Sequence, residues 1–229
     1  EKRVNDIESF AADVAHELKN PLTSLRSASE TFIQAKNKKD QRQMIEIMFK
    51  DIDRIDRLIT DISFSSRLDA DLVRTKFENI DLFKLLENYI SIRATKLKYK
   101  IIHDQNETDI QLIGNSNKLV QVFDNLIDNS LSIIGKNCKI NIRVFSKGKK
   151  IFILFEDNGP GFPKNAINKI FDRFYTDRIN QKEFGKHSGL GLSISKQIIS
   201  AHNGDIFAEN IINDDKKIIG ARVNIILNK

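Results

Sequence analysis

Residues 10–21, FAADVAHELKNP, lie inside a repeat of apolar residues near the start of the 229-residue chain. The apolar positions follow one another in alternating steps of three and four residues, and Pro21 fills the one remaining position of the repeat. A heptad pattern of this kind predicts one helix of a coiled coil or helical bundle. The members of the repeat are Val4, Ile7, Ala11, Val14, Leu18, Leu25, Ala28 and Phe32.

His16 stands at the heptad position farthest from this apolar repeat, so the pattern predicts that its imidazole faces solvent. Glu17 is its neighbour in sequence and Asn20 lies one helical turn later, while Pro21 is expected to bend the helix. The simplest interpretation of a lone helix histidine is a surface residue without a role. The acidic neighbour, the amide and the proline together favour a second interpretation, in which His16 is the nucleophile of a phosphoryl transfer.

A second apolar repeat with the same alternating spacing follows a short polar turn at residues 36–40. Two long amphipathic helices joined by so short a turn predict an antiparallel hairpin. Because two helices alone bury little apolar surface, the hairpin is expected to dimerise into a four-helix bundle. The repeat consists of Ile45, Met48, Ile52, Ile55, Ile59 and Ile62, and the charged face expected to be solvated consists of Asp51, Asp53, Arg54, Asp56 and Arg57.

The composition, with 40% hydrophobic and 30% charged residues, is typical of a globular chain. The net charge of +6 comes from residues 71–229, which have 25 basic and 18 acidic side chains against 12 and 13 in residues 1–70. This excess gives modest support to an anionic ligand rather than nucleic acid, with a solvated basic surface as the alternative. The single Cys138 excludes an internal disulfide, and there is neither a signal peptide nor an apolar run of the ~20 residues that a membrane span needs.

Helix-type and strand-type patterns interleave after residue 70, where a domain boundary and a linker over 68–79 are expected. The whole chain is thus predicted to combine α with an α/β sandwich: a helical hairpin over 1–70, then an α+β domain over 71–229 with a mixed sheet and helices on one face. Residues 163–187 are long for a loop and are expected to be a mobile lid or disordered. The predicted helices are 82–96 with Asp81 as cap, 117–134, a short one at FDRFY and 188–202; the predicted strands are 101–102 and 110–113 around a polar turn, 140–144 and 151–155 in a hairpin, 205–210 and 218–227.

Two asparagines one turn apart, Asn125 and Asn129, share one face of the predicted helix 117–134. Amide oxygens suit a hard cation such as Mg²⁺, which takes few protein ligands and keeps several waters. The alternative is a pair of ordinary surface amides. Farther along, Asp157 ends an apolar strand, where its carboxylate would accept a hydrogen bond from an exocyclic amine such as that of adenine.

Two glycine-containing loops accompany this carboxylate. Gly159 and Gly161 allow the backbone to approach a base closely, whereas Gly189 and Gly191 stand at a predicted helix start, whose free N–H groups can hold phosphates. Each loop alone is a weak signal, because neither matches the P-loop or the dinucleotide fingerprint. Their order after the asparagine pair is much more specific.

In that order the motifs resemble those of sensor histidine kinases, and the resemblance covers essentially the whole chain. FAADVAHELKNPL resembles the H box, NLIDNS the N box, DNGPG the G1 box, FDRFYTD the F box and SGLGLSISKQI the G2 box. The resemblance implies a dimerisation and histidine-phosphotransfer domain followed by an ATP-binding domain of the Bergerat (GHKL) type. LKNPLTSLRSA and the stretch from FYTDR to SGLGLSIS are similar in particular to ChvG/ExoS-type sensors of alphaproteobacteria.

The resemblance also implies roles for individual residues. His16 matches the phosphoacceptor, Glu17 the acid/base residue, and Asn20 the amide that positions water when the cognate regulator is dephosphorylated. Asn129 matches the Mg²⁺ ligand, and Asp157 matches the adenine anchor. The residues implied in binding ATP with its Mg²⁺ are Asn125, Asn129, Asp157, Gly159, Gly161, Tyr175, Arg178, Lys186, His187, Ser188, Gly189, Leu190, Gly191 and Leu192.

Two departures from the family pattern concern the cations near the phosphates. Many members have Lys-Tyr shortly after the N box, where this chain has Ser132 and Ile133, and a basic residue after Phe-Tyr, where it has Thr176. The cation that contacts the γ-phosphate is therefore left open among lid residues, namely Arg178, Lys186 and His187.

The function that the resemblance implies is ATP-dependent autophosphorylation of His16, transfer of the phosphoryl group to an aspartate of a response regulator, and phosphatase activity toward that regulator. The expected partners are a second copy, through residues 1–70, and the receiver domain of the regulator. Neither nucleic acid nor a membrane is expected to contact this fragment, which the resemblance places in the cytoplasmic portion of an inner-membrane sensor. The alternatives are a catalytically weak ATP-binding dimeric scaffold, a phosphatase-dominant member, and an ATPase of the gyrase or Hsp90 type, against which residues 1–70 speak.

Overall fold

The computed structural model describes residues 2–74, 76–96, 100–105, 110–163, 166–175 and 189–229. Contacts between residues divide the chain into two units. Glu1–Asp69 lie in one unit, whereas Ala70–Tyr175 and Gly191–Lys229 form the other. The mobile or disordered lid predicted over 163–187 falls largely outside the described residues.

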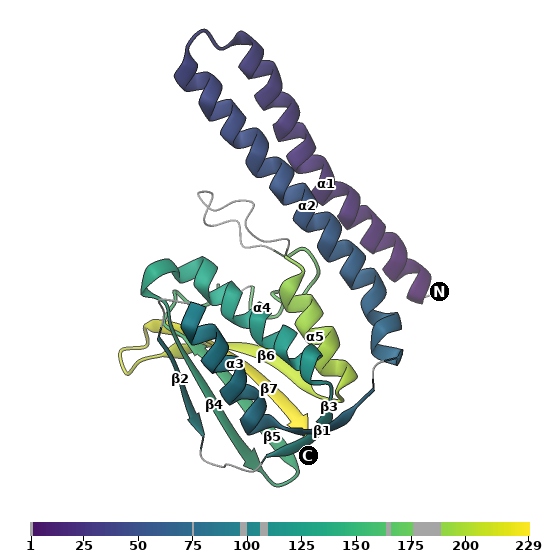
Figure 1. Ribbon diagram of the computed structural model, residues 1–229, viewed down its shortest axis with the longest axis vertical. Helices are drawn as coiled ribbons and strands as arrows, with labels where there is room; N and C mark the ends of the chain where they lie inside the picture. The colour runs from purple at the N-terminus through teal and green to yellow at the C-terminus, as the bar shows by residue number, and fades with distance from the viewer. Residues whose placement is uncertain (1, 75, 97–99, 106–109, 164–165, 176–188) are drawn as a thin grey trace. The chain divides into compact units, whose positions relative to one another are not determined.

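The first unit is a hairpin of two long antiparallel helices, α1 (Lys2–Gln34) and α2 (Lys38–Arg74) (Figure 1). Asn37 closes the turn between them, because its Oδ1 accepts a hydrogen bond from the Asp40 backbone N–H at 2.8 Å. The helix α1 continues through Pro21 without interruption. The helix α2 extends to Arg74, so the prediction of a linker that begins at residue 68 was wrong.

The apolar repeat of α1 is partly buried within one copy of the hairpin, whereas that of α2 is divided between two faces. Ala28 is buried, and Val14, Leu18, Leu25 and Phe32 are half-buried. On α2, Leu58 is buried, but Ile45, Ile52 and Ile59 are exposed, and so is Phe49. The seven-residue spacing of the three isoleucines places them in one stripe, which a single copy leaves uncovered.

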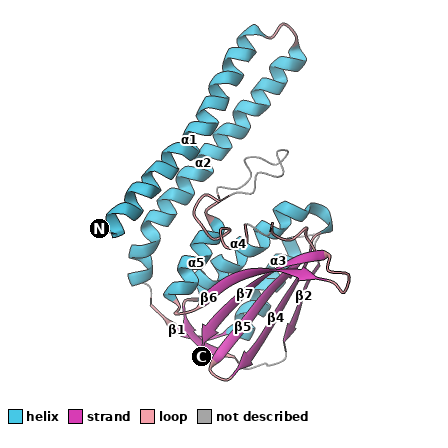
Figure 2. Cartoon of the chain, turned by 180° about the vertical axis from the view of Figure 1, so that it is seen from behind, coloured by secondary structure: helices cyan, strands magenta, loops and turns pink. Residues whose placement is uncertain are grey.

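The second unit is built on a five-stranded sheet in the order β2-β4-β5-β7-β6 (Figure 2). The strands β2 and β4 run parallel, and every other neighbouring pair is antiparallel, so the sheet is mixed as predicted. Two tight turns, one at Gly148 and one at residues 213–217, connect antiparallel neighbours in the sheet. The strands are β2 (Lys100–Gln105), β4 (Lys139–Lys147), β5 (Lys150–Asp157), β6 (Asp205–Ile212) and β7 (Ile218–Asn228).

Three helices cover one face of this sheet (Figures 1 and 2). They are α3 (Leu82–Lys96), α4 (Ser116–Ile134) and α5 (Gly191–Ala201). Alternate residues of the central strands face the helices and are buried, whereas the residues between them are less buried. The core therefore combines one sheet face with the apolar sides of the helices, and its members include Leu86, Leu119, Phe123, Ile127, Ile142, Ile151, Ile153 and Ile225.

Several predicted elements of the second unit are confirmed, but the helix predicted at FDRFY is wrong. Asp81 caps α3, since its Oδ1 accepts a hydrogen bond from the Lys84 backbone N–H at 3.1 Å. The predicted strands 101–102 and 110–113 are confirmed as β2 and β3 (Gln111–Gly114), and the polar turn expected between them lies outside the described residues. The two strands belong to different sheets, because β2 joins the large sheet and β3 pairs with β1 (Glu78–Asp81) in a two-stranded one. FDRFY forms successive turns rather than a helix, and Phe174 has φ 59°.

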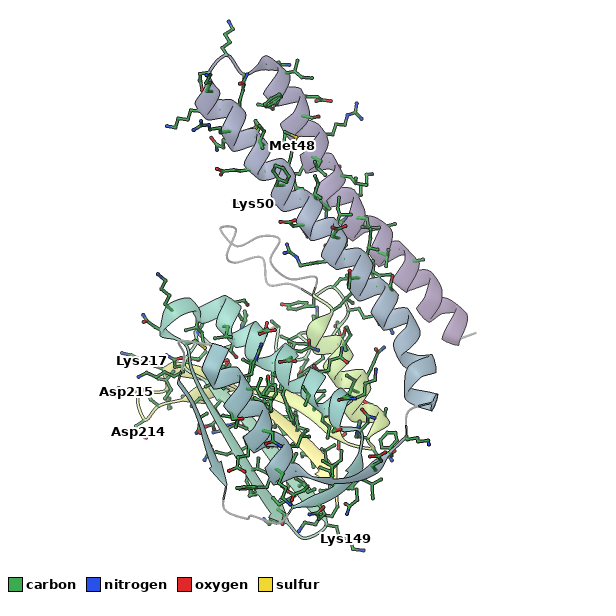
Figure 3. All side chains as sticks on the ribbon, in the orientation of Figure 1. Met48, Lys50, Lys149, Asp214, Asp215 and Lys217 are labelled. Atoms are coloured by element: carbon green, nitrogen blue, oxygen red, sulfur yellow. The ribbon has the colours of Figure 1, made fainter. Side chains whose placement is uncertain are left out.

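The two ends of the large sheet differ in what they carry. Figure 3 shows Lys149 at the β4–β5 turn and Asp214, Asp215 and Lys217 at the β6–β7 turn. Asp157, the last residue of β5, pairs with Ala221 near the start of β7, so it lies at the end of the sheet that carries the β6–β7 turn.

None of the described helices combines the length and the apolar composition that a membrane span needs.

Candidate functional site: a carboxylate beside a glycine loop, and an exposed histidine

The helix α4 presents two asparagines beside the core. Its first turn is capped by Asn115, whose Oδ1 accepts a hydrogen bond from the Lys118 backbone N–H at 3.0 Å. Because the apolar side of α4 packs into the core, Asn125 and Asn129 lie at its margin, and both are half-buried. The predicted helix and its buried side are therefore confirmed, with Leu131 half-buried.

Asn125 connects α4 to the first turn of α5. Its Nδ2 donates to the backbone carbonyl oxygen of Gly191 at 2.9 Å and lies 3.2 Å from Oγ of Ser195. The Ser195 hydroxyl in turn donates to the same Gly191 carbonyl at 2.9 Å. The Asn125 amide therefore holds the helix start that follows the second glycine loop, which gives it a structural task in this position.

Asn129 has a different environment. Its backbone carbonyl accepts a hydrogen bond from the Ser132 hydroxyl at 2.7 Å, but its side-chain amide has no hydrogen-bond partner among the described residues. A half-buried amide oxygen that accepts from no described donor fits the requirement of Mg²⁺ for a hard oxygen ligand. Within the described part of the chain, no cluster of three or more histidine, cysteine or acidic side chains could hold a metal ion by itself.

Asp157 is held by three hydrogen bonds at the end of β5. Its Oδ1 accepts from the backbone N–H groups of Gly159 at 2.9 Å and of Ala221 at 3.4 Å. Its Oδ2 accepts from the hydroxyl of Ser130 on α4 at 2.7 Å. The carboxylate is therefore fixed between a strand, a glycine loop and a helix, with part of its accepting capacity left over.

Two asparagine side chains fasten the loop that follows Asp157. Asn158 accepts from the Lys139 backbone N–H at 2.7 Å and donates to the Asn137 carbonyl at 3.1 Å. Asn210 on β6 accepts from the Phe162 backbone N–H at 2.6 Å and donates to the Phe162 carbonyl at 2.8 Å. The loop is consequently fastened on both sides, as a rigid surface for a ligand would require.

The glycines of this loop are required by geometry. Gly161 has φ +78°, and a Cβ there would lie 2.5 Å from Cγ2 of Ile218. A Cβ at Gly159 would lie 2.9 Å from Oδ1 of Asp157. In β7, a Cβ at Gly220 would approach the Asp157 carbonyl oxygen to 2.1 Å, so glycine alone allows these two strands to meet here.

Sequence reasoning missed Ser130, Asn210 and Gly220. A glycine inside an apolar strand is a recognised signal of close backbone approach, and Gly220 gave that signal. Ser130 follows Asn129 directly, but nothing local shows that its hydroxyl reaches Asp157, 27 residues later.

The second glycine loop lies partly outside the described residues. Gly189 has φ +73°, and Gly191 opens α5, as predicted. Leu190 is buried, and Leu192 and Tyr175 are half-buried. The predicted phosphate-side residues Arg178, Lys186, His187 and Ser188 lie outside the described residues.

A buried histidine joins the far end of α5 to the cap of α4. His202 Nε2 accepts a hydrogen bond from the Asn115 backbone N–H at 3.0 Å, so Nδ1 carries the proton that it shares with the Ile198 carbonyl at 2.8 Å. The ring also packs against Phe77, with 4.8 Å between the ring centroids. Burial lowers the pKa of His202, which favours the neutral form that this arrangement needs.

In the hairpin, His16 and Asn20 are exposed, as the heptad pattern predicts. Glu17 is half-buried and points to the second helix, where its Oε2 accepts from Nη2 of Arg54 at 3.0 Å. The prediction that Arg54 belongs to a solvated charged face was wrong, since this residue is 8% exposed. A guanidinium can occupy an apolar seam when a carboxylate from the facing helix neutralises it.

Two family descriptions match the chain. One is "Histidine kinase-, DNA gyrase B-, and HSP90-like ATPase", over residues 114–228. The other is "His Kinase A (phospho-acceptor) domain", over residues 6–71. The first match includes Asn129, Asp157 and the glycine loops, and the second includes His16.

Curated relatives extend this likeness over nearly the whole chain. The sensor protein ChvG of Agrobacterium fabrum is 43% identical over 98% of this chain and 39% of its own length. The sensor histidine kinase WalK of Bacillus subtilis is 31% identical over 92% of this chain and 36% of its own length. The chain thus spans about two fifths of the length of these relatives.

Solved structures agree with the fold. The catalytic domain of histidine kinase ThkA is 26% identical, with a TM-score of 0.58 over 68% of this chain and 99% of that one. The structure of ThkA in complex with the response regulator TrrA is 22% identical, with a TM-score of 0.72 over 100% of this chain and 63% of that one. The second likeness shows that the hairpin followed by the α+β unit is a known arrangement of elements.

Proposed function

The chain belongs to the histidine kinase-, DNA gyrase B- and HSP90-like ATPase family, with a His Kinase A domain in front, and from this premise we propose that it is an ATP-dependent protein-histidine kinase. It phosphorylates His16 and passes the phosphoryl group to an aspartate of a response regulator, toward which it also acts as a phosphatase. The observation that carries the proposal is the presence, on one chain, of an exposed helix histidine and a carboxylate held between a helix and a glycine loop.

ATP is the nucleotide that suits the second unit. The Asp157 carboxylate accepts the exocyclic N–H of adenine, and the loop with Gly159 and Gly161 gives the base close access to the backbone. The start of α5 after Gly189 offers backbone N–H groups to phosphate oxygens. Asn129 is the protein ligand of the Mg²⁺, which supplies charge neutralisation at the phosphates when bound.

His16 supplies the nucleophile of the phosphoryl transfer. A ring nitrogen forms a bond to the γ-phosphorus, the bond from that phosphorus to the bridging oxygen breaks, and ADP leaves with the electron pair. The second ring nitrogen then loses its proton, for which Glu17 is the acceptor. Since Glu17 is bound by Arg54 on the facing helix, the accepting oxygen is the one that the guanidinium leaves free.

The proposed kinase is a homodimer of two-domain chains. The exposed apolar stripe of α2 supports dimerisation through residues 1–70, and residues 71–229 then form the ATP-binding domain. Asn20 positions water for release of phosphate from the regulator. Relatives that are named as sensor proteins support a cytoplasmic location of this portion within an inner-membrane sensor.

The deciding experiment incubates the purified chain with γ-labelled ATP and Mg²⁺. We expect a label that is acid-labile and base-stable, present in wild type and in the control E30A, which removes an exposed side chain of the same helix. The label is absent in H16A, whose nucleotide affinity stays at the wild-type value. Labelling that persists in H16A would refute the phosphoacceptor assignment, and ATP binding without any label in wild type would favour the scaffold alternative.

A further inference from the structure

Within the described residues, one side chain hydrogen-bonds to the Asp157 carboxylate, and it is Ser130 on α4. Oγ of Ser130 donates to Oδ2 of Asp157 at 2.7 Å, and the contact joins the helix that carries Asn129 to the end of β5. Both partners are half-buried, so water competes less for this bond than at an exposed site. The bond therefore restricts the orientation of the Asp157 carboxylate.

The accepting capacity of the carboxylate can be counted. Two oxygens offer about four lone-pair sites. The backbone N–H groups of Gly159 and Ala221 use both sites on Oδ1, and the Ser130 hydroxyl uses one on Oδ2. Among the described residues this leaves one site, on Oδ2, which can take a single N–H of a ligand.

We propose that Ser130 is a positioning residue that makes this site selective for purines with a 6-amino group. The inference rests on the proposed function, in which Asp157 binds the base of ATP. With Oδ2 held by the hydroxyl, the carboxylate keeps one plane and directs its remaining site toward one donor. A 6-oxo purine presents an acceptor to that site, and a purine without the 6-substituent leaves it unpaired, so both bind more weakly.

Replacing Ser130 by alanine weakens this selection rather than the binding of phosphates. Oδ1 keeps its two backbone donors, but Oδ2 then has two open sites and no partner that sets its plane. The affinity for ATP falls, whereas the affinity for purine riboside triphosphate, which makes no use of the site, stays nearly constant.

The test measures dissociation constants of ATP, inosine triphosphate and purine riboside triphosphate by calorimetry at one Mg²⁺ concentration. For wild type we expect ATP to bind at least about tenfold more tightly than the other two. In S130A this ratio falls by about threefold to tenfold, which is the effect of one hydrogen bond. S130T, which keeps a hydroxyl, retains most of the ratio. S91A is the matched control, because the described partner of the Ser91 hydroxyl is the Asn88 carbonyl of its own helix.

The outcomes separate the inference from the function on which it rests. If wild type prefers ATP, D157N abolishes the preference and S130A keeps it in full, the Ser130 inference is overturned and the adenine anchor stands. If wild type shows no preference, the adenine anchor itself is refuted, and Ser130 with it. If S130A loses its cooperative thermal transition, S130C, whose side chain is of nearly equal size, replaces it in the test. Because a thiol is a weak donor, S130C is also expected to lose the preference for ATP over the other two nucleotides.

Discussion

The carboxylate of Glu17 on α1 is bound by the guanidinium of Arg54 on α2 at 3.0 Å. Glu17 follows the exposed His16, so the proposed acid/base residue of one helix is anchored on the other. The side chains of Arg54 and Glu17 are 10% and 21% exposed, which distinguishes this pair from the surface pair of Arg26 and Glu30 at 82% and 61%. Because the pair is largely buried and Glu17 is adjacent to His16, the packing of the hairpin and the chemistry of His16 depend on the same ion pair.

Replacing Arg54 by methionine leaves the Glu17 carboxylate partly buried without its cation. We expect the free energy of unfolding of the hairpin to fall by about 1–3 kcal/mol, below the cost of breaking a fully buried pair. Labelling of His16 also slows, because the carboxylate loses its fixed direction. Differential scanning calorimetry and labelling rates check both results. R26M, which breaks the exposed pair, should change stability by less than about 0.5 kcal/mol; equal effects of the two variants would contradict the role of burial.

The two asparagines of α4 should separate into a ligand and a structural residue. N129A is expected to lose Mg²⁺-dependent nucleotide affinity at unchanged thermal stability, because its side chain has no described protein partner. N125A removes two contacts to the start of α5, so it lowers the free energy of unfolding by about 1–2 kcal/mol. Titration with nucleotide at varied Mg²⁺ and thermal melting distinguish the two. A loss of Mg²⁺ dependence in N125A alone would reverse the assignment.

Gly161 should be needed both for its positive φ and for its lack of a side chain. In G161A the new Cβ meets Ile218 at 2.5 Å and Oδ1 of Asn210 at 2.6 Å, so the loop beside Asp157 must move and nucleotide affinity falls. Gly148 provides the matched control, since its φ is +64° but no atom lies within 4 Å of a Cβ there. G148A should cost about 1 kcal/mol of stability and leave nucleotide affinity unchanged. Equal affinities of the two variants would show that the loop tolerates the shift.

His202 should make stability depend on pH. Burial lowers its pKa in the folded chain from the ordinary value of 6.5, so the unfolded chain binds the proton more readily. The contribution of the neutral ring is therefore complete above about pH 6.5 and declines as the pH falls below it. In H202Q, which lacks a titrating group, the difference in free energy of unfolding from wild type should shrink between about pH 7 and pH 5.5. Urea unfolding at several pH values measures this, and a constant difference would refute it.

Much of the fold follows from local sequence. The heptad repeats predicted both long helices, Asp81 predicted the start of α3 at Leu82, and alternation predicted the hairpin of β4 and β5. The candidate site was likewise predicted in its main members, because Asn129, Asp157 and the glycines each stand beside a recognisable element boundary or helix face.

Other features depend on contacts between distant segments. Periodicity identified the apolar positions of α2, but the same period describes two adjacent faces of the helix. The sequence therefore could not separate exposed Ile45 from the residues that pack inside one hairpin. The strand β1 was overlooked because its four residues gain stability only by pairing with β3, about 30 residues later. FDRFY has the composition of a short helix, but it forms turns that bury its two phenylalanines, Phe171 and Phe174.

The sequence by itself determined the two-part organisation, the identity of most elements and the candidate residues, because helix periodicity, strand alternation and capping act over a few neighbouring residues. Only the tertiary structure decided which side chains hold these candidates: Arg54 on Glu17, and Ser130 on Asp157. These pairs are separated by 37 and 27 residues. A hydrogen bond needs two groups within about 3 Å in a defined direction, and packing of whole elements, rather than local pattern, brings such groups together.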